Sequence, residues 1–263
     1  MDSKLLPELI SLTFEAGETI MSLHKKPTNF SIKSDNTPVT EADKASHQLI
    51  SKALEKLTPN IPILSEESSE IPFSVRKEWK EYWLIDPLDG TRDFIDGSPD
   101  FCISIALIKK NYPNFGLIYS PFNKAHYYCL PGQTSIKLVD NISQKLCTKK
   151  PKRWQNIVVG RYSNNNKGLK NHLKLKTNFE TFKLGSALKF CLIAEGLYHY
   201  YPKFGRCSEW DTAAGVCILE GAGGKVVDFK NQPLVYNSNE ATLSPAFKAA
   251  ALNAGLSVSS LQL

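Results

Sequence analysis

The stretch Tyr82-Trp83-Leu84-Ile85-Asp86-Pro87-Leu88-Asp89-Gly90-Thr91 places two carboxylates, a hydroxyl and a glycine directly after an aromatic and β-branched run. Such a run predicts a buried strand, and Pro87 with Gly90 predicts that the backbone breaks where the acids begin. In α/β folds, ligands bind outside the carboxyl ends of strands. Mg²⁺ binds through a few carboxylates and leaves its other positions to water and substrate phosphate. We therefore interpret the stretch as a strand that ends in half of a metal site.

Acids that could complete this site lie in three other segments. Glu66 and Glu67 follow the short apolar run 61–64, which indicates a second strand end. Asp211 lies in 209–215, a segment that indicates the start of a helix, and Asp43 follows Pro38-Val39-Thr40. All four segments together offer enough oxygen ligands for Mg²⁺.

Each acid also has an interpretation that needs no metal. Asp86 and Asp89 fit an Asx-type turn with solvated carboxylates. Thr40-x-x-Asp43 before an apolar-periodic run resembles a capping box, which is compatible with a further role for Asp43. Asp211 fits the favourable place of an acid at a helix amino end. The joint occurrence of the four segments favours the metal site.

The composition is that of a globular protein. The 263 residues fit one large domain or two of about 130 residues. No apolar run approaches the roughly 20 residues of a membrane span, and Met1-Asp2-Ser3-Lys4 leads into an amphipathic segment rather than a signal peptide. The six cysteines form no Cys-x-x-Cys pair, which favours reduced thiols and no zinc site. These features predict a cytoplasmic protein.

The net charge of +6 raises a non-enzymatic alternative, a nucleotide- or RNA-binding protein whose acids serve structure or Ca²⁺. Only Lys149-Lys150-Pro151-Lys152-Arg153 forms a basic cluster, and a solvated loop is the favoured interpretation of such a run. A positive field also suits an anionic substrate. We expect a small-molecule partner and no nucleic acid, while peripheral attachment to a membrane through the basic surface stays open.

The spacing of apolar residues predicts an α+β half followed by an α/β half. Helices are expected over 5–23, 45–57, 188–195 and 212–220. Strands are expected over 101–108, 115–119, 126–130, 135–138, 157–159 and 224–228, with those between 115 and 138 in an antiparallel meander. The polar stretch 140–155 is the best candidate boundary. We expect domain 1–139 to carry the metal site and domain 140–263 to close the substrate site.

The four acidic motifs, in this order, resemble those of the inositol monophosphatase superfamily of Mg²⁺-dependent, lithium-sensitive phosphatases. The matching motifs are Val39-Thr40 with Asp43, Glu66-Glu67, the block 86–91 and Trp210-Asp211. The resemblance spans nearly the whole chain. It implies the sugar phosphatase fold, a layered α+β and α/β sandwich of stacked helices and sheets.

Within the superfamily, the chain is most similar to the bacterial 3'(2'),5'-bisphosphate nucleotidases. The similarity rests on Gly185-Ser186-Ala187-Leu188-Lys189-Phe190-Cys191, Ala194-Glu195-Gly196, Tyr201-Pro202-Lys203-Phe204-Gly205 and Trp210-Asp211-Thr212-Ala213-Ala214-Gly215. It implies hydrolysis of 3'-phosphoadenosine 5'-phosphate, or of its sulfated relative, to AMP or adenosine 5'-phosphosulfate and phosphate. Inositol monophosphate or another small sugar phosphate is the alternative substrate.

The resemblance also implies roles for the matching positions. Two or three Mg²⁺ ions would be bound by Glu66, Asp86, Asp89, Asp211 and the carbonyl of Leu88. Asp43 and Thr91 would orient the attacking water, and Glu66 would share in catalysis. No covalent phosphoenzyme is expected, because Asp86 and Asp89 are three residues apart and not two. Glu67 is expected behind the site, since one extended backbone cannot turn both neighbouring acids to one side.

Substrate contacts are implied for a larger set. These are Glu66, Leu88, Asp89, Gly90, Thr91, Ser186, Lys189, Lys203 and Asp211. Lys189 could instead be an exposed helix lysine. Lys203 disfavours inositol, because the inositol phosphatases carry an acid near this point to hold sugar hydroxyls, whereas a cation suits a second phosphate.

One segment departs from the nucleotidase pattern. Where those enzymes tend to have Ser-Arg-Ser-His, this chain has Gly160-Arg161-Tyr162-Ser163-Asn164, so a base or phosphate contact from that histidine is missing. The departure affects the expected substrate preference and not the expected catalysis. The sequence leaves monomer and homodimer open.

Overall fold

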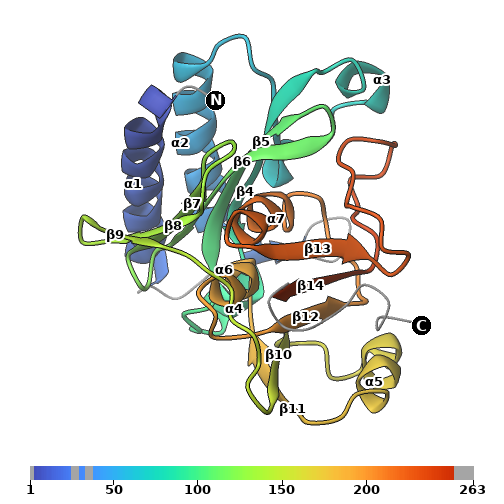
Figure 1. Ribbon diagram of the computed structural model, residues 1–263. Helices are drawn as coiled ribbons and strands as arrows, with labels where there is room; N and C mark the ends of the chain where they lie inside the picture. The colour runs from blue at the N-terminus through green and yellow to red at the C-terminus, as the bar shows by residue number, and fades with distance from the viewer. Residues whose placement is uncertain (1–2, 25–29, 33–37, 252–263) are drawn as a thin grey trace.

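The computed structural model describes residues 3–24, 30–32 and 38–251. They form alternating layers of helices and sheets (Figure 1). The chain begins with η1 (Ser3–Leu5) and α1 (Leu6–His24), followed by the antiparallel pair β1 (Phe30–Ile32) and β2 (Pro38–Thr40), and then by α2 (Glu41–Leu57). The two amphipathic helices expected near the start of the chain are confirmed.

A seven-stranded sheet forms the centre of the molecule, in the order β3-β4-β5-β6-β7-β8-β9. β3 (Ile63–Ser65) pairs parallel with β4 (Glu81–Asp89), and all later neighbours are antiparallel. The remaining strands are β5 (Cys102–Lys109), β6 (Tyr112–Ser120), β7 (Ala125–Cys129), β8 (Ile136–Val139) and β9 (Ile142–Lys145). The predicted meander is therefore confirmed. It continues by one strand, β9, into the polar stretch.

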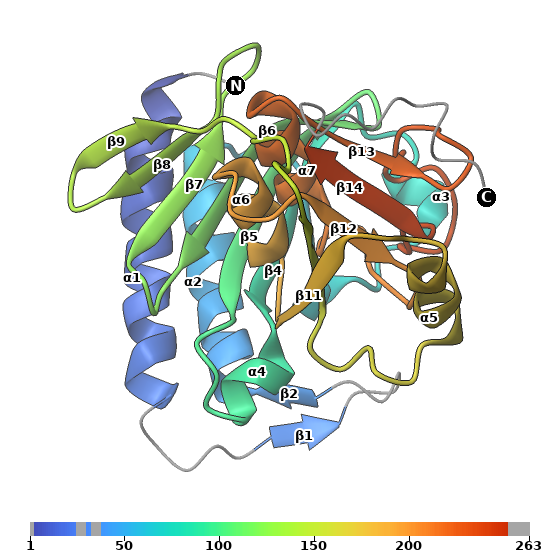
Figure 2. The same ribbon diagram turned by 60° about the horizontal axis from the view of Figure 1, so that its bottom comes forward.

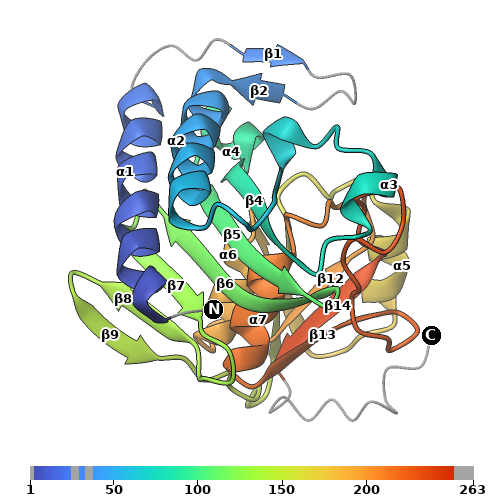
Figure 3. The same cartoon turned by 90° about the horizontal axis from the view of Figure 1, so that it is seen from above.

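Both faces of this sheet are buried at its central strands β4, β5 and β6. α1 and α2 cover one face, as Figure 3 shows from above. Trp83, Ile85 and Leu117 belong to the same core cluster as the buried residues of these two helices. Tyr82 and Leu84 belong to a second cluster on the opposite face. Successive residues of a strand point to opposite faces of the sheet. Successive residues of β5 therefore pack into different core clusters, and all of them except the last are buried.

A five-stranded sheet follows, in the order β11-β10-β12-β14-β13. Its strands are β10 (Gln155–Gly160), β11 (Phe179–Leu184), β12 (Tyr200–Lys203), β13 (Gly224–Asp228) and β14 (Phe247–Ala251). α6 (Leu188–Ala194) and α7 (Ala213–Gly221) lie between the two sheets, and α5 (Lys167–Lys174) covers the outer face of the smaller one (Figure 2). The helices and strands expected in this half are confirmed. The division into domains 1–139 and 140–263 stays a prediction.

Three short elements connect the larger ones near the acidic residues. They are the 3₁₀ turn η2 (Glu66–Ser68), α3 (Phe73–Arg76) and α4 (Thr91–Ile95). Within the described ranges, no helix is both long enough and apolar enough to cross a membrane.

A buried histidine between β7 and α1 makes the free energy of unfolding depend on pH. His126 on β7 stacks on Tyr119 with 4.1 Å between ring centroids, and its Nε2 lies 3.1 Å from the Thr13 hydroxyl on α1. Burial lowers the pKa of His126 from 6.5 to about 4. The unfolded chain therefore takes up a proton between these two values that the folded chain does not. This site makes the folded state lose stability as the pH falls through that window.

The expected size is about 3 kcal/mol of unfolding free energy, at about 1.4 kcal/mol per pKa unit. Chemical denaturation near pH 7 and near pH 4 measures it. His126→Phe keeps an aromatic ring but cannot titrate, so the variant should lose less stability on acidification than the wild type. Equal losses in both proteins would contradict the assignment.

Candidate active site

The acids of the 86–91 block lie within a strand and not after its end. β4 runs through Pro87 to Asp89, so the break predicted at the first acid is wrong. Asp86 pairs with Ser104 and Asp89 with Cys102, which leaves two residues of β4 opposite one of β5. This is a β-bulge, and a proline is tolerated there because the ladder bond it cannot make is already interrupted. The acids therefore lie at the carboxyl end of β4 as predicted, with a bulge where a break was expected.

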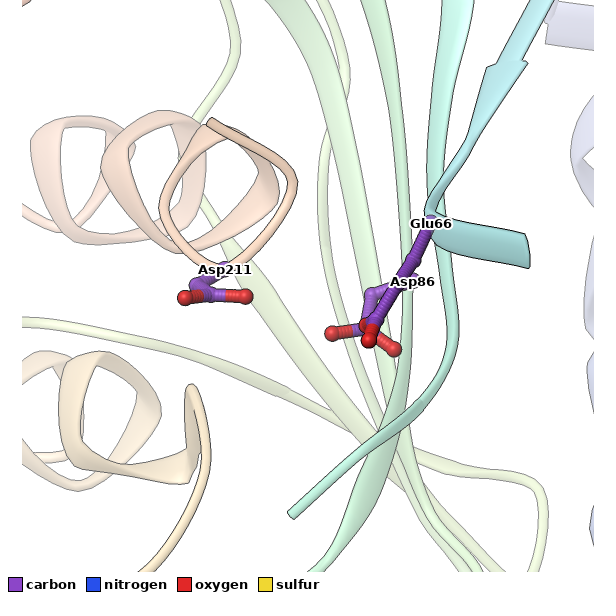
Figure 4. A group of neighbouring side chains, drawn as sticks. All are labelled: Glu66, Asp86 and Asp211. Atoms are coloured by element: carbon purple, nitrogen blue, oxygen red, sulfur yellow. The ribbon is translucent and has the colours of Figure 1, made fainter. Parts of the chain in front are cut away.

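Three carboxylates from three elements meet beside the bulge. Glu66 begins η2 directly after β3, Asp86 lies on β4, and Asp211 precedes α7 (Figure 4). One oxygen of each lies within 4.8 Å of the others. Oxygen donors at this spacing are the ligand chemistry that Mg²⁺ requires. Three of the predicted metal ligands are thus close enough to share one ion.

The charges in this group oppose one another. Burial raises the pKa of Asp86 well above its usual value, and the charges of Glu66, Asp89 and Asp211 raise it further. Burial also raises the pKa of Asp211, against the N–H bond it accepts from Ser208 at 2.8 Å. Buried carboxylates in this number are costly unless a cation compensates them. The donor set therefore fits a divalent ion on both its chemistry and its charge.

Asp89 and Leu88 adjoin this group. Asp89 is the last residue of β4. Its pKa is raised to about 7, mainly by burial and secondly by the charge of Asp211. One Asp89 oxygen accepts the backbone N–H of Ala187, so it links the two halves of the chain. The Leu88 side chain is fully buried, and its N–H donates to Asp86 Oδ1 at 3.0 Å. That both residues bind metal stays a prediction.

Asp43 combines the two roles that the sequence left compatible. Its Oδ2 accepts the backbone N–H of Thr40 at 2.7 Å, which completes a capping box at the start of α2. Its Oδ1 accepts the Thr91 hydroxyl at 2.9 Å. Burial raises the pKa of Asp43. One carboxylate therefore both caps a helix and holds a hydroxyl of the site.

Two other positions near the turn have specific local causes. Gly90 has a φ of 97°, and a Cβ there would lie 2.9 Å from the carbonyl oxygen of Asp100, so only glycine fits. Glu67 lies in a 3₁₀ turn, so the extended backbone assumed for Glu66 and Glu67 is wrong. Burial raises the pKa of Asp43 and lowers that of His47, and in both cases the charge of Glu67 acts to raise the pKa.

A cavity of about 590 Å³ opens between the acids and the second half of the chain. All the predicted substrate contacts line it: Glu66, Leu88, Asp89, Gly90, Thr91, Ser186, Lys189, Lys203 and Asp211. Asp43 is not part of its wall and lies behind Thr91. The volume is typical of a site for a small molecule.

Lys189 is buried and not an exposed helix lysine, so that alternative is wrong. Its Nζ lies 3.4 Å from the Leu184 carbonyl, also donates to the Ser186 carbonyl, and stands 5.1 Å from the centre of the Tyr201 ring. Burial lowers its pKa, while the charge of Asp89 raises it. Lys203, at the end of β12, is half-buried. These two lysines therefore share the cavity with the acids.

The segment that departs from the nucleotidase pattern also contributes to the cavity. Arg161, Tyr162 and Ser163 line it, whereas Asn164 is exposed and does not. The Tyr162 hydroxyl donates to Asp96 at 2.7 Å. Sequence reasoning noticed this segment only for its missing histidine. The signal for Arg161 was available, since it lies two residues after the expected strand 157–159, but its partners are distant in sequence.

Comparison with known proteins agrees with this geometry. The family model described as the inositol monophosphatase family matches residues 1–260. The 3'(2'),5'-bisphosphate nucleotidase CysQ of Salmonella typhimurium is 39% identical over 246 residues, covering 93% of this chain and 98% of that protein. CysQ from Bacteroides thetaiotaomicron, a bacterial member of the family, is 33% identical with a TM-score of 0.80, covering 92% of this chain and 95% of its own.

A more distant relative supports the fold alone. The Thermotoga maritima IMPase superposes with a TM-score of 0.80 at 24% identity, covering 98% of this chain and 95% of its own. The layered α+β sandwich expected from the sequence is thus confirmed. With a family match over residues 1–260 and the carboxylates of Glu66, Asp86 and Asp211 grouped together, the chain belongs to the inositol monophosphatase family.

Proposed function

We infer that this chain is a 3'(2'),5'-bisphosphate nucleotidase, which removes the 3'-phosphate of 3'-phosphoadenosine 5'-phosphate or of its sulfated form. The observation that carries the inference is one cavity that holds a carboxylate group together with Lys189 and Lys203. The 39% identity to a nucleotidase over 93% of the chain supports it. Lysines beside a metal site suit a substrate that carries more than one phosphate.

The residues that would hold divalent ions are Glu66, Asp86, Asp89, Asp211 and the Leu88 carbonyl. Two or three Mg²⁺ ions are proposed, in keeping with the resemblance. Such ions supply a more acidic water and stabilise the charge on the leaving ribose oxygen. The donor set supports this because four of its members are buried or half-buried carboxylates that line one cavity.

Thr91 and Asp43 would orient the attacking water. The Thr91 hydroxyl already donates its proton to Asp43, so its oxygen lone pairs are left to accept a hydrogen bond from water. The raised pKa of Asp43 suits a group that takes up a proton. Glu66, which begins η2, lines the same cavity as Thr91. Water attacks phosphorus directly, and no phosphoenzyme forms.

Gly90, Thr91, Ser186, Lys189 and Lys203 would bind the substrate. The first N–H groups of a helix have no partner within the helix, and α4 begins at Thr91, so these groups suit the transferred phosphate. The second phosphate would bind toward Lys203. This arrangement distinguishes a nucleotide bisphosphate from inositol monophosphate.

Phosphate release from 3'-phosphoadenosine 5'-phosphate and from inositol 1-phosphate, measured in parallel with Mg²⁺ and with added Li⁺, tests the proposal. We expect fast, lithium-sensitive release from the nucleotide and slow release from inositol 1-phosphate. Asp89→Asn should remove the activity. Phosphate release mainly from inositol 1-phosphate would overturn the substrate assignment. Phosphate release that does not depend on Mg²⁺ would overturn the mechanism.

A further inference from the structure

Arg161 connects the second half of the chain to the loop that carries the site. It directly follows β10, and its side chain reaches two acids on either side of the turn 96–99. Its Nε lies 2.6 Å from Asp93 Oδ1, and its Nη2 pairs with Asp100 Oδ2 and lies 3.1 Å from the Ser98 hydroxyl. One guanidinium therefore engages three side chains of the first half.

The two acids depend on this contact. Asp93 is 3% exposed and Asp100 is 8% exposed. Burial raises the pKa of Asp93, the pairing with Arg161 lowers it, and the charge of Asp100 raises it. Removing one partner of a buried ion pair leaves an uncompensated charge, which is strongly unfavourable. Without Arg161, two buried carboxylates would repel each other.

The same two acids, Asp93 and Asp100, contact the segment 185–187. The Gly185 N–H donates to Asp100 Oδ2 at 3.3 Å. A Cβ on Gly185 would lie 2.5 Å from Asp93 Oδ2 and 2.6 Å from the Asp100 carbonyl oxygen. Beyond Gly185, the backbone of Ser186 has a φ of 46°, and the Ala187 N–H donates to Asp89. Any movement of Asp93 and Asp100 would displace this segment.

We propose that Arg161 is a positioning residue, which holds Asp93 and Asp100 in place and through them sets the position of the segment 185–187. This segment contains Ser186 and leads directly into α6 with Lys189, and both residues are proposed substrate contacts. The proposal rests on the function inferred above. The competing role is direct contact with a substrate phosphate, because Arg161 lines the cavity and its side chain is 36% exposed.

A double-mutant cycle separates the two roles. Arg161→Gln is made in the wild type and in an Asp93→Asn, Asp100→Asn background. In the wild type, the KM for 3'-phosphoadenosine 5'-phosphate should rise on the order of tenfold or more, since small displacements of binding groups are costly. In the background without the two charges, the same change should have little effect. An equal loss in both backgrounds would assign Arg161 to direct substrate contact and overturn the proposal.

Amide hydrogen exchange of the peptide 184–189, measured without substrate, gives a readout that does not depend on activity. Arg161→Gln should speed this exchange at least about tenfold, Arg161→Lys should restore part of the protection, and exposed Arg153→Gln should leave it unchanged. Unchanged exchange in a folded Arg161→Gln protein would overturn the proposal. If the wild type does not hydrolyse 3'-phosphoadenosine 5'-phosphate, the proposed function is overturned. The hydrogen-exchange result would still test the positioning role of Arg161.

Discussion

Asp86→Asn is expected to lower Mg²⁺-dependent phosphate release by about a thousandfold or more. The loss of several kcal/mol of metal-assisted stabilisation corresponds to that factor, at about 1.4 kcal/mol per tenfold. Asp86 is 1% exposed and lies with Glu66 and Asp211 in the carboxylate group. Asparagine keeps an oxygen that can accept the Leu88 N–H, so the bulge should survive. Steady-state rates at saturating Mg²⁺ measure the loss.

The same variant should be more stable than the wild type when metal is removed. The pKa of Asp86 is raised in the folded protein, so above its unfolded value of 3.8 the ionised carboxylate opposes folding. Metal-free wild type therefore loses stability as the pH rises from 3.8 toward the raised pKa of Asp86 in the folded protein. Asp86→Asn removes this unfavourable contribution. Melting temperatures with chelator and with Mg²⁺ should show a higher metal-free value and a smaller Mg²⁺ effect in the variant.

Asp140→Asn is the matched control, since Asp140 is exposed in the turn between β8 and β9. It should change neither the rate nor the response to Mg²⁺. If Asp86→Asn were stabilised by Mg²⁺ as strongly as the wild type, the carboxylate group would not be the metal site.

The sequence was sufficient for features that depend on local patterns. The apolar spacing in 5–23 and 45–57 predicts α1 and α2 because a helix buries one stripe of side chains. The capping box at Thr40 and Asp43 was also visible, since its two residues are three apart. Hydroxyl contact between Asp43 and Thr91 required the resemblance, because 48 residues separate them.

Features that depend on pairing between distant strands could not be predicted. The β-bulge in β4 exists because β5 pairs on both sides of Pro87, whereas local reasoning from proline and glycine gives a break. Exposure of Lys189 could not be judged either, since the segment 184–189 is covered by the first half of the chain. Arg161 has partners 61 and 68 residues away. No local pattern reports such contacts.

Lys203→Glu is expected to change which substrate the enzyme prefers. Lys203 ends β12, lines the cavity, and lowers the pKa of Asp211 by its charge. A charge-assisted contact to phosphate contributes about 1.5–3 kcal/mol, so kcat/KM for 3'-phosphoadenosine 5'-phosphate should fall on the order of a hundredfold. Inositol 1-phosphate has no second phosphate to lose, so its kcat/KM should change far less. Lys203→Met, which removes the charge without reversing it, should lie between the wild type and Lys203→Glu.

The comparison of two substrates also tests where Lys203 acts. If its main role were to stabilise Asp211, the replacement would disturb metal binding and both substrates would lose activity together, with a higher Mg²⁺ requirement. If it binds the second phosphate, the loss is confined to the nucleotide and appears mainly in KM. Lys174→Glu, at the exposed end of α5, makes the same change in net charge and should leave both substrates unaffected. Equal losses for the two substrates would remove the assignment of Lys203 as the residue that selects a bisphosphate.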